Sequence, residues 1–281
     1  MATSEPSFVS SPTWHIAIVN YRTTELAVRA IRAAHQASPT ARLVVVDNAS
    51  DPASAELLRQ QELAEVLALE ENRGYGAALN AGTSGASAPF LLLLNADVAI
   101  NAAALQRFSD HFQRLEGLGI VAPRLLSDDG TPQPSCRRFP THTSLLWSRQ
   151  SPLSHFSAYA RGRYVLPEPS AFTLTDVVAG ACMAIRREIW QELGGMDERF
   201  FLFAEDTDLC YRAKQAGWLV GYDPAARVDH VWGASTRQEP RRIRRLHAES
   251  LEWYFRKHYP GKRLTNLALA TLLKAHTLWA R

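Results

Sequence analysis

The segment Pro89–Asp97, PFLLLLNAD, is the clearest indication of the fold. A continuous apolar run of this length, bounded by Pro and by Asn and Asp, is typical of a strand buried on both faces of a sheet. Two earlier segments have the same character, WHIAIVN (Trp14–Asn20) and RLVVVD (Arg42–Asp47), and each ends in a polar residue. The three segments predict the central strands of a parallel sheet.

Helical patterns alternate with these strands. The predicted elements are helices at Thr24–Ala37, Ala53–Gln61 and Gly76–Ser84 and a short strand at Glu65–Leu69. Strands that alternate with helices predict an α/β fold whose sheet is covered on both faces. In such a sheet the ligand binds at the carboxyl ends of the strands. The polar residues predicted at those ends are Asn20, Asp47, Asn48, Asn95 and Asp97.

The second half of the chain is less regular. The expected strands are Leu118–Leu126, Thr175–Arg187, WLVGY (Trp218–Tyr222) and RVDHVW (Arg227–Trp232), with helices at Arg187–Leu193 and Glu205–Gln215. Residues 139–170 lack periodicity, and so long a loop within a compact domain is usually functional or mobile. We divide the chain into a disordered N-terminal tail (1–13), one domain (14–235, with halves 14–126 and 127–235) and a helical tail (236–281).

The composition is that of an ordinary globular protein and excludes several classes. The chain has 281 residues, of which 46% are hydrophobic and 21% are charged, so it is not disordered, collagen-like or a coiled coil. Its three cysteines are too few and too scattered for a disulfide framework or a zinc site. No run approaches the roughly 18–20 apolar residues that span a bilayer, and the N-terminus lacks the pattern of a secretory signal. We expect a cytoplasmic protein.

The net charge of +3 hides an uneven distribution. Residues 241–281 contain ten Lys and Arg against two Asp and Glu, a balance of +8, while residues 1–240 have a balance of −5. Within this tail, Arg241–His258 and Leu264–Trp279 are amphipathic. Such an element favours an anionic membrane surface, although a helix that packs on the protein or on a second copy has the same pattern. The acidic body argues against a nucleic-acid partner.

Several short polar motifs follow the strands, and each has a structural and a functional interpretation. Asn95-Ala96-Asp97 could hold Mg²⁺ or Mn²⁺ against a diphosphate, or it could be a turn. Asp47 could bind a base or a ribose, or Ser50 could simply cap the next helix. The loop Asn72–Gly76 suits either an anionic ligand at a helix start or a capping turn.

Three more candidates lie in the second half. Glu205, Asp206 and Asp208 crowd at a helix start after an aromatic run. Apolar surroundings and like charges raise a carboxyl pKa and make a competent general base, although a helix N-terminus also favours acids for its own stability. His230 is a candidate metal or phosphate ligand, or a structural histidine. The segment Gly180–Cys182 is small enough for a sugar to approach closely.

Together these segments resemble a family 2 glycosyltransferase of the GT-A fold, in its rhamnosyltransferase-like branch. The resemblance extends from Ile16 to Ser235, and its longest block is VVAGACMAIRREIWQELGGMDERFFLFAEDTDLCYRAKQAGW. The other segments that carry it are IAIVNYR, VVVDNAS, ENRGYGAALNAG, LLLLNAD and DPAARVDHVWGAS. The fold that this implies is α/β, with a mostly parallel sheet flanked by helices. A nucleotide-sugar half would precede an acceptor half and a basic helical tail.

The resemblance also implies roles for individual residues. The donor site that it implies contains Asn20, Asp47, Arg73, Gly74 and Asn95. The metal site would contain Asp97 and His230, and the acceptor site would lie near Gly180, Ala181 and Cys182. Asp206 would be the catalytic base, with Glu205 beside it shaping its pKa. This chain has Asn95 where the family's DxD motif begins with an acid, which removes one charge from the metal site.

The implied reaction is an inverting, metal-assisted sugar transfer. The donor would be dTDP-rhamnose or a UDP-sugar, and the acceptor a hydroxyl of a glycan or of a polyprenyl-diphosphate-linked glycan. The enzyme would then work at the inner face of the plasma membrane, as a monomer or a homo-oligomer. Two alternatives are a sugar-nucleotide pyrophosphorylase and a catalytically inactive carbohydrate-binding relative. The first would need a Gly-rich basic loop after the first strand, where the chain has Asn20–Thr23.

Overall fold

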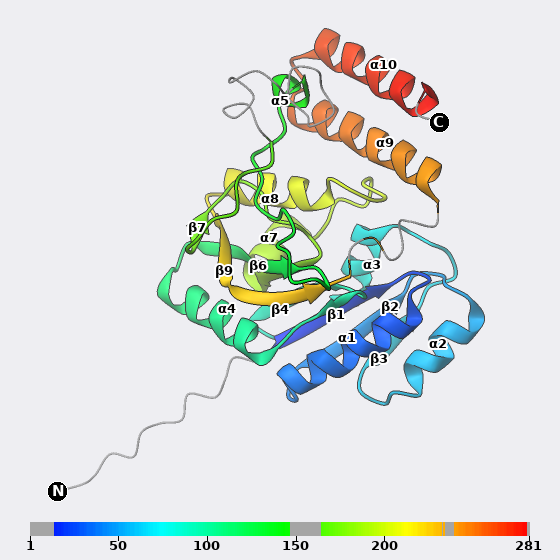
Figure 1. The fold of residues 1–281 in the computed structure, drawn as a ribbon, viewed down its shortest axis with the longest axis vertical. Coiled ribbons are helices and arrows are strands. Elements are labelled where there is room, and N and C mark those ends of the chain that lie inside the picture. Colours follow the sequence, from blue (N-terminus) through cyan, green and yellow to red (C-terminus); the bar gives the residue numbers. More distant parts are fainter. Residues whose placement is uncertain (1–13, 147–163, 232, 234–238, 280–281) are drawn as a thin grey trace, which may run out of the picture.

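The computed structural model describes residues 14–146, 164–231, 233 and 239–279. The expected N-terminal tail, residues 1–13, and most of the aperiodic stretch 139–170 lie outside the described residues. Figure 1 shows a central sheet with helices on both faces and a helical hairpin at one end of the molecule. No helix in the described part of the chain is both long and apolar enough to cross a membrane.

The first half of the sheet is parallel. Its strands are β1 (Trp14–Asn20), β2 (Arg42–Asp47), β3 (Glu65–Ala68) and β4 (Phe90–Asn95). In the registers of β1 with β2 and with β4, Asn20 lies opposite Asp47 and Val19 lies opposite Asn95. The polar ends of these strands therefore meet at one edge of the sheet, as the sequence predicts.

Helices cover both faces of the sheet because successive strand residues point to opposite sides. Ile16 and Ile18 of β1 pack with α1 (Thr24–Ala37), α2 (Pro52–Arg59) and α4 (Ala102–Arg114). Ala17 and Val19 of the same strand pack with α3 (Tyr75–Gly82), α7 (Arg187–Leu193) and α8 (Glu205–Gln215). Two apolar cores result, and the strand ends between them are left for polar groups.

The second half of the sheet is mixed. Its strands are β5 (Val98–Ala99), β6 (Leu118–Leu126), β7 (Thr173–Leu174), β8 (Cys182–Arg186) and β9 (Leu219–His230). The order is β3-β2-β1-β4-β8-β6-β9-β5, with β7 paired to β9. Strand β8 is antiparallel to β4, so it begins where β4 ends. The backbone N–H of Asn95 accordingly donates to the carbonyl of Ala181, just before β8, at 2.9 Å.

Strand β9 combines two segments that the sequence predicts as separate strands. Its pairing with β6 shifts between Pro123, which lies opposite Asp223, and Arg124, which lies opposite Arg227. The extra residues bulge, and the buried Asp223 carboxylate accepts a hydrogen bond from Arg107 of α4 at 2.7 Å. The prediction of two strands is therefore wrong, because β9 continues through Asp223 and Pro224, which lie in the bulge. The predicted strand Thr175–Arg187 is likewise shortened to β8.

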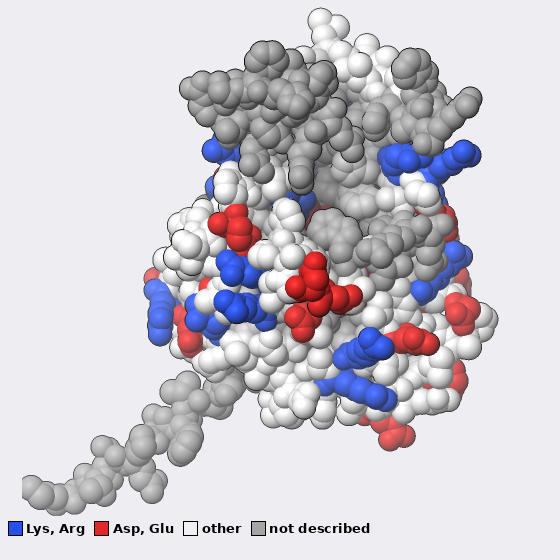
Figure 2. Space-filling model, viewed as in Figure 1, with Lys and Arg blue, Asp and Glu red and all other residues white. Residues whose placement is uncertain are grey.

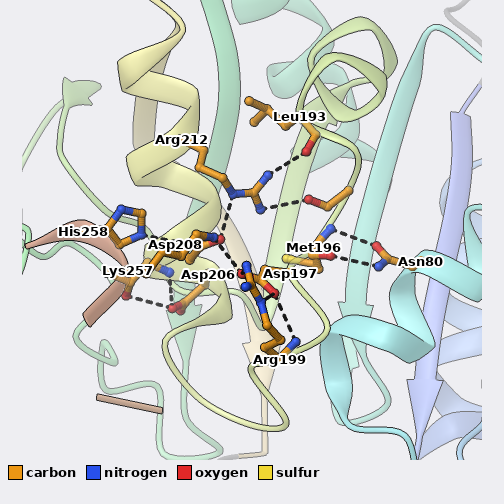
Figure 3. A network of polar contacts seen from close by, with 12 residues as sticks. Asn80, Leu193, Met196, Asp197, Arg199, Asp206, Asp208, Arg212, Lys257 and His258 are labelled. Atoms are coloured by element: carbon orange, nitrogen blue, oxygen red, sulfur yellow. Dashed lines mark hydrogen bonds and ion pairs between the residues drawn. The ribbon is translucent and has the colours of Figure 1, made fainter. Parts of the chain in front are cut away.

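The C-terminal helices pack on the rest of the domain. They are α9 (Pro240–His258) and α10 (Arg263–Trp279), which form the hairpin in Figure 1; a short helix, α5 (His142–Leu146), lies nearby. Tyr254 and Phe255 of α9 form a small core with Phe200. Lys257 and His258 also donate to the buried carboxylate of Asp208 on α8 (Figure 3). The predicted boundary at residue 235 lies outside the described residues, but α9 is joined closely to the domain.

Candidate active site

A cavity of about 320 Å³ lies at the edge where the parallel strands end. The loops after β1 to β4, the residues before β8, the start of α8 and the start of α9 all contribute to it. Its polar lining includes Asn48, Asn72, Asn95, Asp97, Arg137, Glu205, Asp206, His230, Glu239 and Arg242. The topology thus gathers residues from both halves of the chain around one space of ligand size.

Asn20 and Asp47 are buried and are absent from the described lining of this cavity. The Asn20 amide donates to Asp47 Oδ1 at 2.8 Å and to Ser54 Oγ at 3.0 Å. The same Asp47 oxygen accepts a hydrogen bond from Ser54 Oγ at 3.1 Å. The two residues predicted to bind the sugar donor therefore connect β1, β2 and α2 by hydrogen bonds, and their side chains bond to each other and to Ser54.

Asn48, next to Asp47, lines the cavity instead. Its amide donates to Asn72 Oδ1 at 3.0 Å and to the carbonyl of Gly74 at 3.1 Å, and its oxygen accepts from the Arg73 backbone at 3.0 Å. Sequence reasoning placed Asn48 at a strand end but gave it no role. The sequence signal was the pair of consecutive polar residues at the end of β2, Asp47 and Asn48.

The loop before α3 is fixed by a close backbone approach. Gly74 has a φ of +87°, and a Cβ there would lie 2.4 Å from the carbonyl oxygen of Phe201. The backbone N–H of Tyr75 donates to the same oxygen at 2.9 Å. Gly74 lines the cavity, whereas the Arg73 guanidinium pairs with the half-exposed Glu198 at 3.0 Å and is not part of the described lining. The predicted donor contact of Arg73 is therefore not favoured by its position.

Asp97 and His230 face each other across the cavity edge. His230 Nε2 is 3.3 Å from Asp97 Oδ1, and that buried oxygen has no hydrogen-bond partner in the described chain. Gln133 uses its amide N–H to donate to the His230 carbonyl at 2.9 Å, so its oxygen faces His230 Nδ1 at 2.5 Å. An amide oxygen only accepts, so Nδ1 of His230 carries a proton and Nε2 is the ring nitrogen that faces Asp97.

Two electron-pair donors held this close fit a cation between them. Among the described residues no group of three or more His, Cys, Asp or Glu side chains could hold a metal alone. Mg²⁺ and Mn²⁺ sites next to phosphates commonly use one or two protein ligands and complete their coordination with substrate oxygens and water. Asp97 and His230 are therefore suited to a shared site, with Gln133 orienting the histidine.

The carboxylates of Glu205 and Asp206 have different surroundings. Asp206 Oδ2 accepts from Arg137 Nη2 at 2.5 Å and from the Gly180 backbone at 3.0 Å. Its other oxygen accepts from the Thr207 backbone and hydroxyl, at 2.6 and 3.0 Å. Glu205 is buried, and burial together with the charge of Asp206 raises the pKa of Glu205 to about 8. Arg137 was missed by sequence reasoning because it lies outside every element and motif predicted from the sequence, just before the aperiodic stretch 139–170.

The three predicted acceptor residues separate into two groups. Gly180 and Ala181 line the cavity, and the carbonyl of Gly180 accepts a hydrogen bond from the Tyr75 hydroxyl at 3.0 Å. Cys182 is the first residue of β8 and is fully buried in the apolar core. Burial also raises the pKa of its thiol. Its position is that of a core residue and does not support acceptor contact.

The start of α9 completes the cavity. Arg242, Ile243 and Leu246 line it, and Glu239 joins Arg242 to Arg22 in the loop after β1, with ion-pair distances of 3.1 and 3.2 Å. The amphipathic pattern predicts an inward-facing Ile243 and Leu246, but it does not reveal that they face a ligand-sized space. The basic tail thus contributes directly to the site.

Comparison with known proteins identifies the family. The model of the family described as "Glycosyltransferase like family 2" matches residues 12–259. The chain belongs to this family. This glycosyltransferase is 28% identical, over 242 residues, to N-acetylglucosaminyl-diphospho-decaprenol L-rhamnosyltransferase of Mycobacterium tuberculosis, covering 79% of the chain and 76% of the relative.

Solved structures agree with the expected GT-A fold. The mannosyltransferase PcManGT of Pyrobaculum calidifontis, in complex with GDP-Man and Mn²⁺, has a TM-score of 0.61 and 18% identity, over 97% of this chain and 77% of that one. GalNAc-T7 with UDP, GalNAc and Mn²⁺ has a TM-score of 0.59 and 17% identity, over 94% of this chain. The glycosyltransferase spans about half, 54%, of the GalNAc-T7 chain. The predicted family and fold are confirmed.

Proposed function

We propose that this glycosyltransferase moves rhamnose from dTDP-rhamnose, with a UDP-sugar as the second choice of donor, onto a glycan hydroxyl carried by a polyprenyl diphosphate. The observation that carries the proposal is the similarity to the mycobacterial rhamnosyltransferase along most of both chains. The name of that relative includes a diphospho-decaprenol acceptor, and the segments singled out from the sequence of this chain contribute to one cavity.

The proposed reaction is a single displacement that inverts the anomeric carbon. Asp97 and His230 would hold a divalent cation, which would supply positive charge for the departing nucleoside diphosphate. Asp206 would be the base for the acceptor hydroxyl, with Glu205 beside it shaping its pKa. Asn95, at the end of β4 and in the cavity lining, would face the donor. No second carboxylate nucleophile is needed, unlike in a retaining glycosidase.

The alternatives are less well supported by the site. The family match is to glycosyltransferases and gives no support to a pyrophosphorylase. A catalytically inactive relative would be expected to lack an essential group, yet Asp97, Glu205 and Asp206 are all present and line one cavity.

A donor screen tests the proposed function. We expect release of nucleoside diphosphate from dTDP-rhamnose to be at least about ten times faster than from UDP-glucose, UDP-N-acetylglucosamine or GDP-mannose, since a polar site discriminates strongly between sugar hydroxyl patterns. The acceptor would be N-acetylglucosaminyl diphosphate on a short polyprenol, with Mn²⁺ present. Faster turnover of another donor contradicts the rhamnose assignment, and retention of configuration in the product, seen by NMR, contradicts the single displacement.

We also propose that α10 contacts the membrane that carries such an acceptor. Leu264, Leu267 and Leu272 on this helix are exposed by 85%, 66% and 62%. In Figure 2 the end of the molecule where α10 lies is largely uncharged outside the grey atoms. Lys262, just before the helix, and Lys274, in its second half, are exposed on either side of these leucines in the sequence. Exposed leucines flanked by cations suit an interface with anionic lipid headgroups.

Replacing the three α10 leucines with serine is expected to reduce co-sedimentation with phosphatidylglycerol vesicles by about tenfold or more, because each buried leucine contributes roughly 1.5–3 kcal/mol. Leu57→Ser on α2, where the leucine is 48% exposed, is the matched control and should bind as the native chain does. Unchanged vesicle binding by the triple variant contradicts the proposal. Loss of a dimer in light scattering, without any vesicle binding, would assign the surface to a second copy. Substitution is preferable to truncation because α9 lines the cavity.

A further inference from the structure

The cavity has a second positive group besides the proposed metal site. It is the ion-paired set of Arg22, Glu239 and Arg242, which joins the loop after β1 to the start of α9. Glu239 Oε2 lies 3.1 Å from Arg242 Nη1, and Glu239 Oε1 lies 3.2 Å from Arg22 Nη1. Because two cations share one carboxylate, the set keeps a net positive charge.

Arg242 presents this charge to the cavity. It is part of the lining, its side chain is 38% exposed, and its guanidinium lies 5.7 Å from the ring centroid of Phe201. A guanidinium has five N–H donors in a planar fork that suits phosphate oxygens. Arg242 can therefore keep its pair with Glu239 and still donate to a phosphate.

The second positive group is built from other side chains than the proposed metal site. Arg242 contacts Glu239 and Phe201. Asp97, after β4, instead faces His230 at the end of β9, with 3.3 Å between Oδ1 and Nε2. The cavity thus offers two separate places where an anionic group can be neutralised.

The first turns of α9 connect this arginine to the neighbourhood of the proposed base. Leu246 lines the same cavity, and the ring of the next residue, His247, lies 5.2 Å from the ring of Phe203 between centroids. Phe203 is three residues before Asp206. Arg242 and Leu246 are one helical turn apart, about 6 Å along the axis.

The proposed reaction brings two diphosphates to this cavity. One leaves with the nucleoside of the donor, and the other joins the acceptor sugar to its polyprenyl chain. In an inverting displacement the acceptor oxygen attacks the face of the sugar opposite the leaving group. The two diphosphates therefore lie on different sides of the reacting carbon, and each needs its own positive partner.

We propose that Arg242 binds the diphosphate of the polyprenyl-linked acceptor, and that Ile243 and Leu246 line the part of the cavity that holds the acceptor sugar. This inference rests on the proposed sugar transfer. One sugar ring separates the acceptor hydroxyl near Asp206 from the diphosphate of the same molecule, and one turn of α9 supplies a comparable separation. In Figure 1, α9 lies between α10 and the rest of the domain, so this diphosphate lies between the helix proposed to contact the membrane and the catalytic residues.

Calorimetry with geranyl diphosphate tests the assignment without requiring sugar transfer. The protein is first saturated with dTDP and Mn²⁺, so that the donor site is filled. Geranyl diphosphate should still bind the native chain, and Arg242→Gln should weaken its binding by about 10–100-fold, because a hydrogen bond between charged groups is lost. Binding of dTDP itself should be the same in both proteins.

Three results of this titration overturn the proposal. They are equal binding of geranyl diphosphate to the native and Arg242→Gln proteins, displacement of dTDP by geranyl diphosphate, and weaker dTDP binding in the variant. The last two assign the arginine to the donor. Raising NaCl from about 0.05 M to about 0.5 M should weaken binding to the native chain, and a binding constant that does not change with salt contradicts the proposal even if Arg242→Gln fails to fold.

Two further variants show whether position matters as well as charge. Arg242→Lys keeps the charge without the planar fork and should bind geranyl diphosphate more tightly than Arg242→Gln does. Arg245→Gln is the matched control, because Arg245 is on the same helix, pairs with the exposed Glu249 at 3.4 Å and lies outside the described lining of the cavity. It should bind as the native chain does, and a loss as large as that of Arg242→Gln contradicts a specific site. Circular dichroism verifies the fold of each variant.

Turnover with two acceptors separates this inference from the proposed function. They are N-acetylglucosaminyl diphosphate on a short polyprenol and octyl N-acetylglucosaminide, which has no phosphate, each with the donor that is turned over fastest. Arg242→Gln should raise KM for the first by about 10–100-fold and leave transfer to the second unchanged. Equal losses with both acceptors overturn the assignment. A native chain that transfers no sugar to either acceptor from any donor overturns the proposed function, while the geranyl diphosphate titration still decides whether Arg242 binds a prenyl diphosphate.

Discussion

Asp97→Asn is expected to lower kcat/KM by about 10³-fold, equivalent to about 4 kcal/mol of transition-state stabilisation. Asp97 Oδ1 is buried, has no hydrogen-bond partner in the described chain and lies 3.3 Å from His230 Nε2. The substitution keeps the size of the side chain but removes its negative charge. The family's motif begins with an acid where this chain has Asn95, so Asp97 is the remaining carboxylate of the Asn-Ala-Asp segment.

The effect is best measured as metal-dependent binding together with turnover. Titration calorimetry with dTDP, with and without Mn²⁺, should show that Mn²⁺ strengthens nucleotide binding to the native chain and has little effect on Asp97→Asn. Asp110→Asn on α4 is the matched control, since the Asp110 carboxylate accepts a hydrogen bond from Gln106 one turn away and lies outside the described lining of the cavity. Equal Mn²⁺ dependence in the native and Asp97→Asn proteins would rule out Asp97 as a metal ligand.

Asp208→Asn is expected to lower the free energy of unfolding by about 3–5 kcal/mol, the usual effect of breaking a buried ion pair on one side. The Asp208 carboxylate is fully buried and accepts hydrogen bonds from Arg212 at 2.7 Å, Lys257 at 2.5 Å and His258 at 2.7 Å. Figure 3 shows these side chains converging from α8 and α9. Removing the charge leaves partly buried cations without compensation at the junction of the two helices.

The same carboxylate makes stability depend on pH. Burial alone would raise the pKa of Asp208, but the hydrogen bond from His258 and the charges of Arg212 and Lys257 outweigh it, so its pKa lies below the ordinary value. A depressed pKa contributes stability at pH values above the ordinary pKa, and this contribution is lost as the pH falls through the lower value. Native and Asp208→Asn proteins should therefore differ most at neutral pH and converge in acid.

Urea unfolding monitored by circular dichroism measures this difference. Arg245→Gln, which breaks the exposed pair of Arg245 and Glu249 on α9, is the matched control and should change stability by no more than about 0.5 kcal/mol. If Asp208→Asn lowers the free energy of unfolding by less than about 1 kcal/mol, the ion pairs of Asp208 do not stabilise the packing of α9 on α8. Because α9 lines the cavity, we also expect Asp208→Asn to weaken nucleotide binding.

Local patterns predicted most of the elements well. The bounds of β1, α1, β2 and α8 coincide with the sequence prediction, because buried strands and amphipathic helices leave a periodic trace that needs no knowledge of distant contacts. The two segments of β9 were wrongly separated, because an Asp-Pro step predicts a break unless a partner strand and a side chain such as Arg107 stabilise a bulge. That stabilisation comes from α4, far away in the sequence.

The site was predicted in part. The positions of Gly74, Asn95, Asp97, Gly180, Glu205, Asp206 and His230 in one cavity agree with the segments singled out from the sequence. Asn20, Asp47, Arg73 and Cys182 are outside its described lining, whereas Asn48, Arg137 and Arg242 are within it. A motif identifies polar residues near a strand end, but neighbouring residues there point in different directions, and only packing determines which of them face the ligand.

By itself, the sequence determined the family, the α/β fold and the edge of the sheet where the chemistry gathers, because short-range periodicity and ordered motifs encode these properties. Only the tertiary structure decided which groups are already satisfied. It showed that Arg137 donates a hydrogen bond to Asp206, that the Gln133 side chain orients His230, and that residues of α9 line the cavity. The physical reason is that hydrogen bonding and burial depend on residues brought together from distant parts of the chain, which no local sequence pattern records.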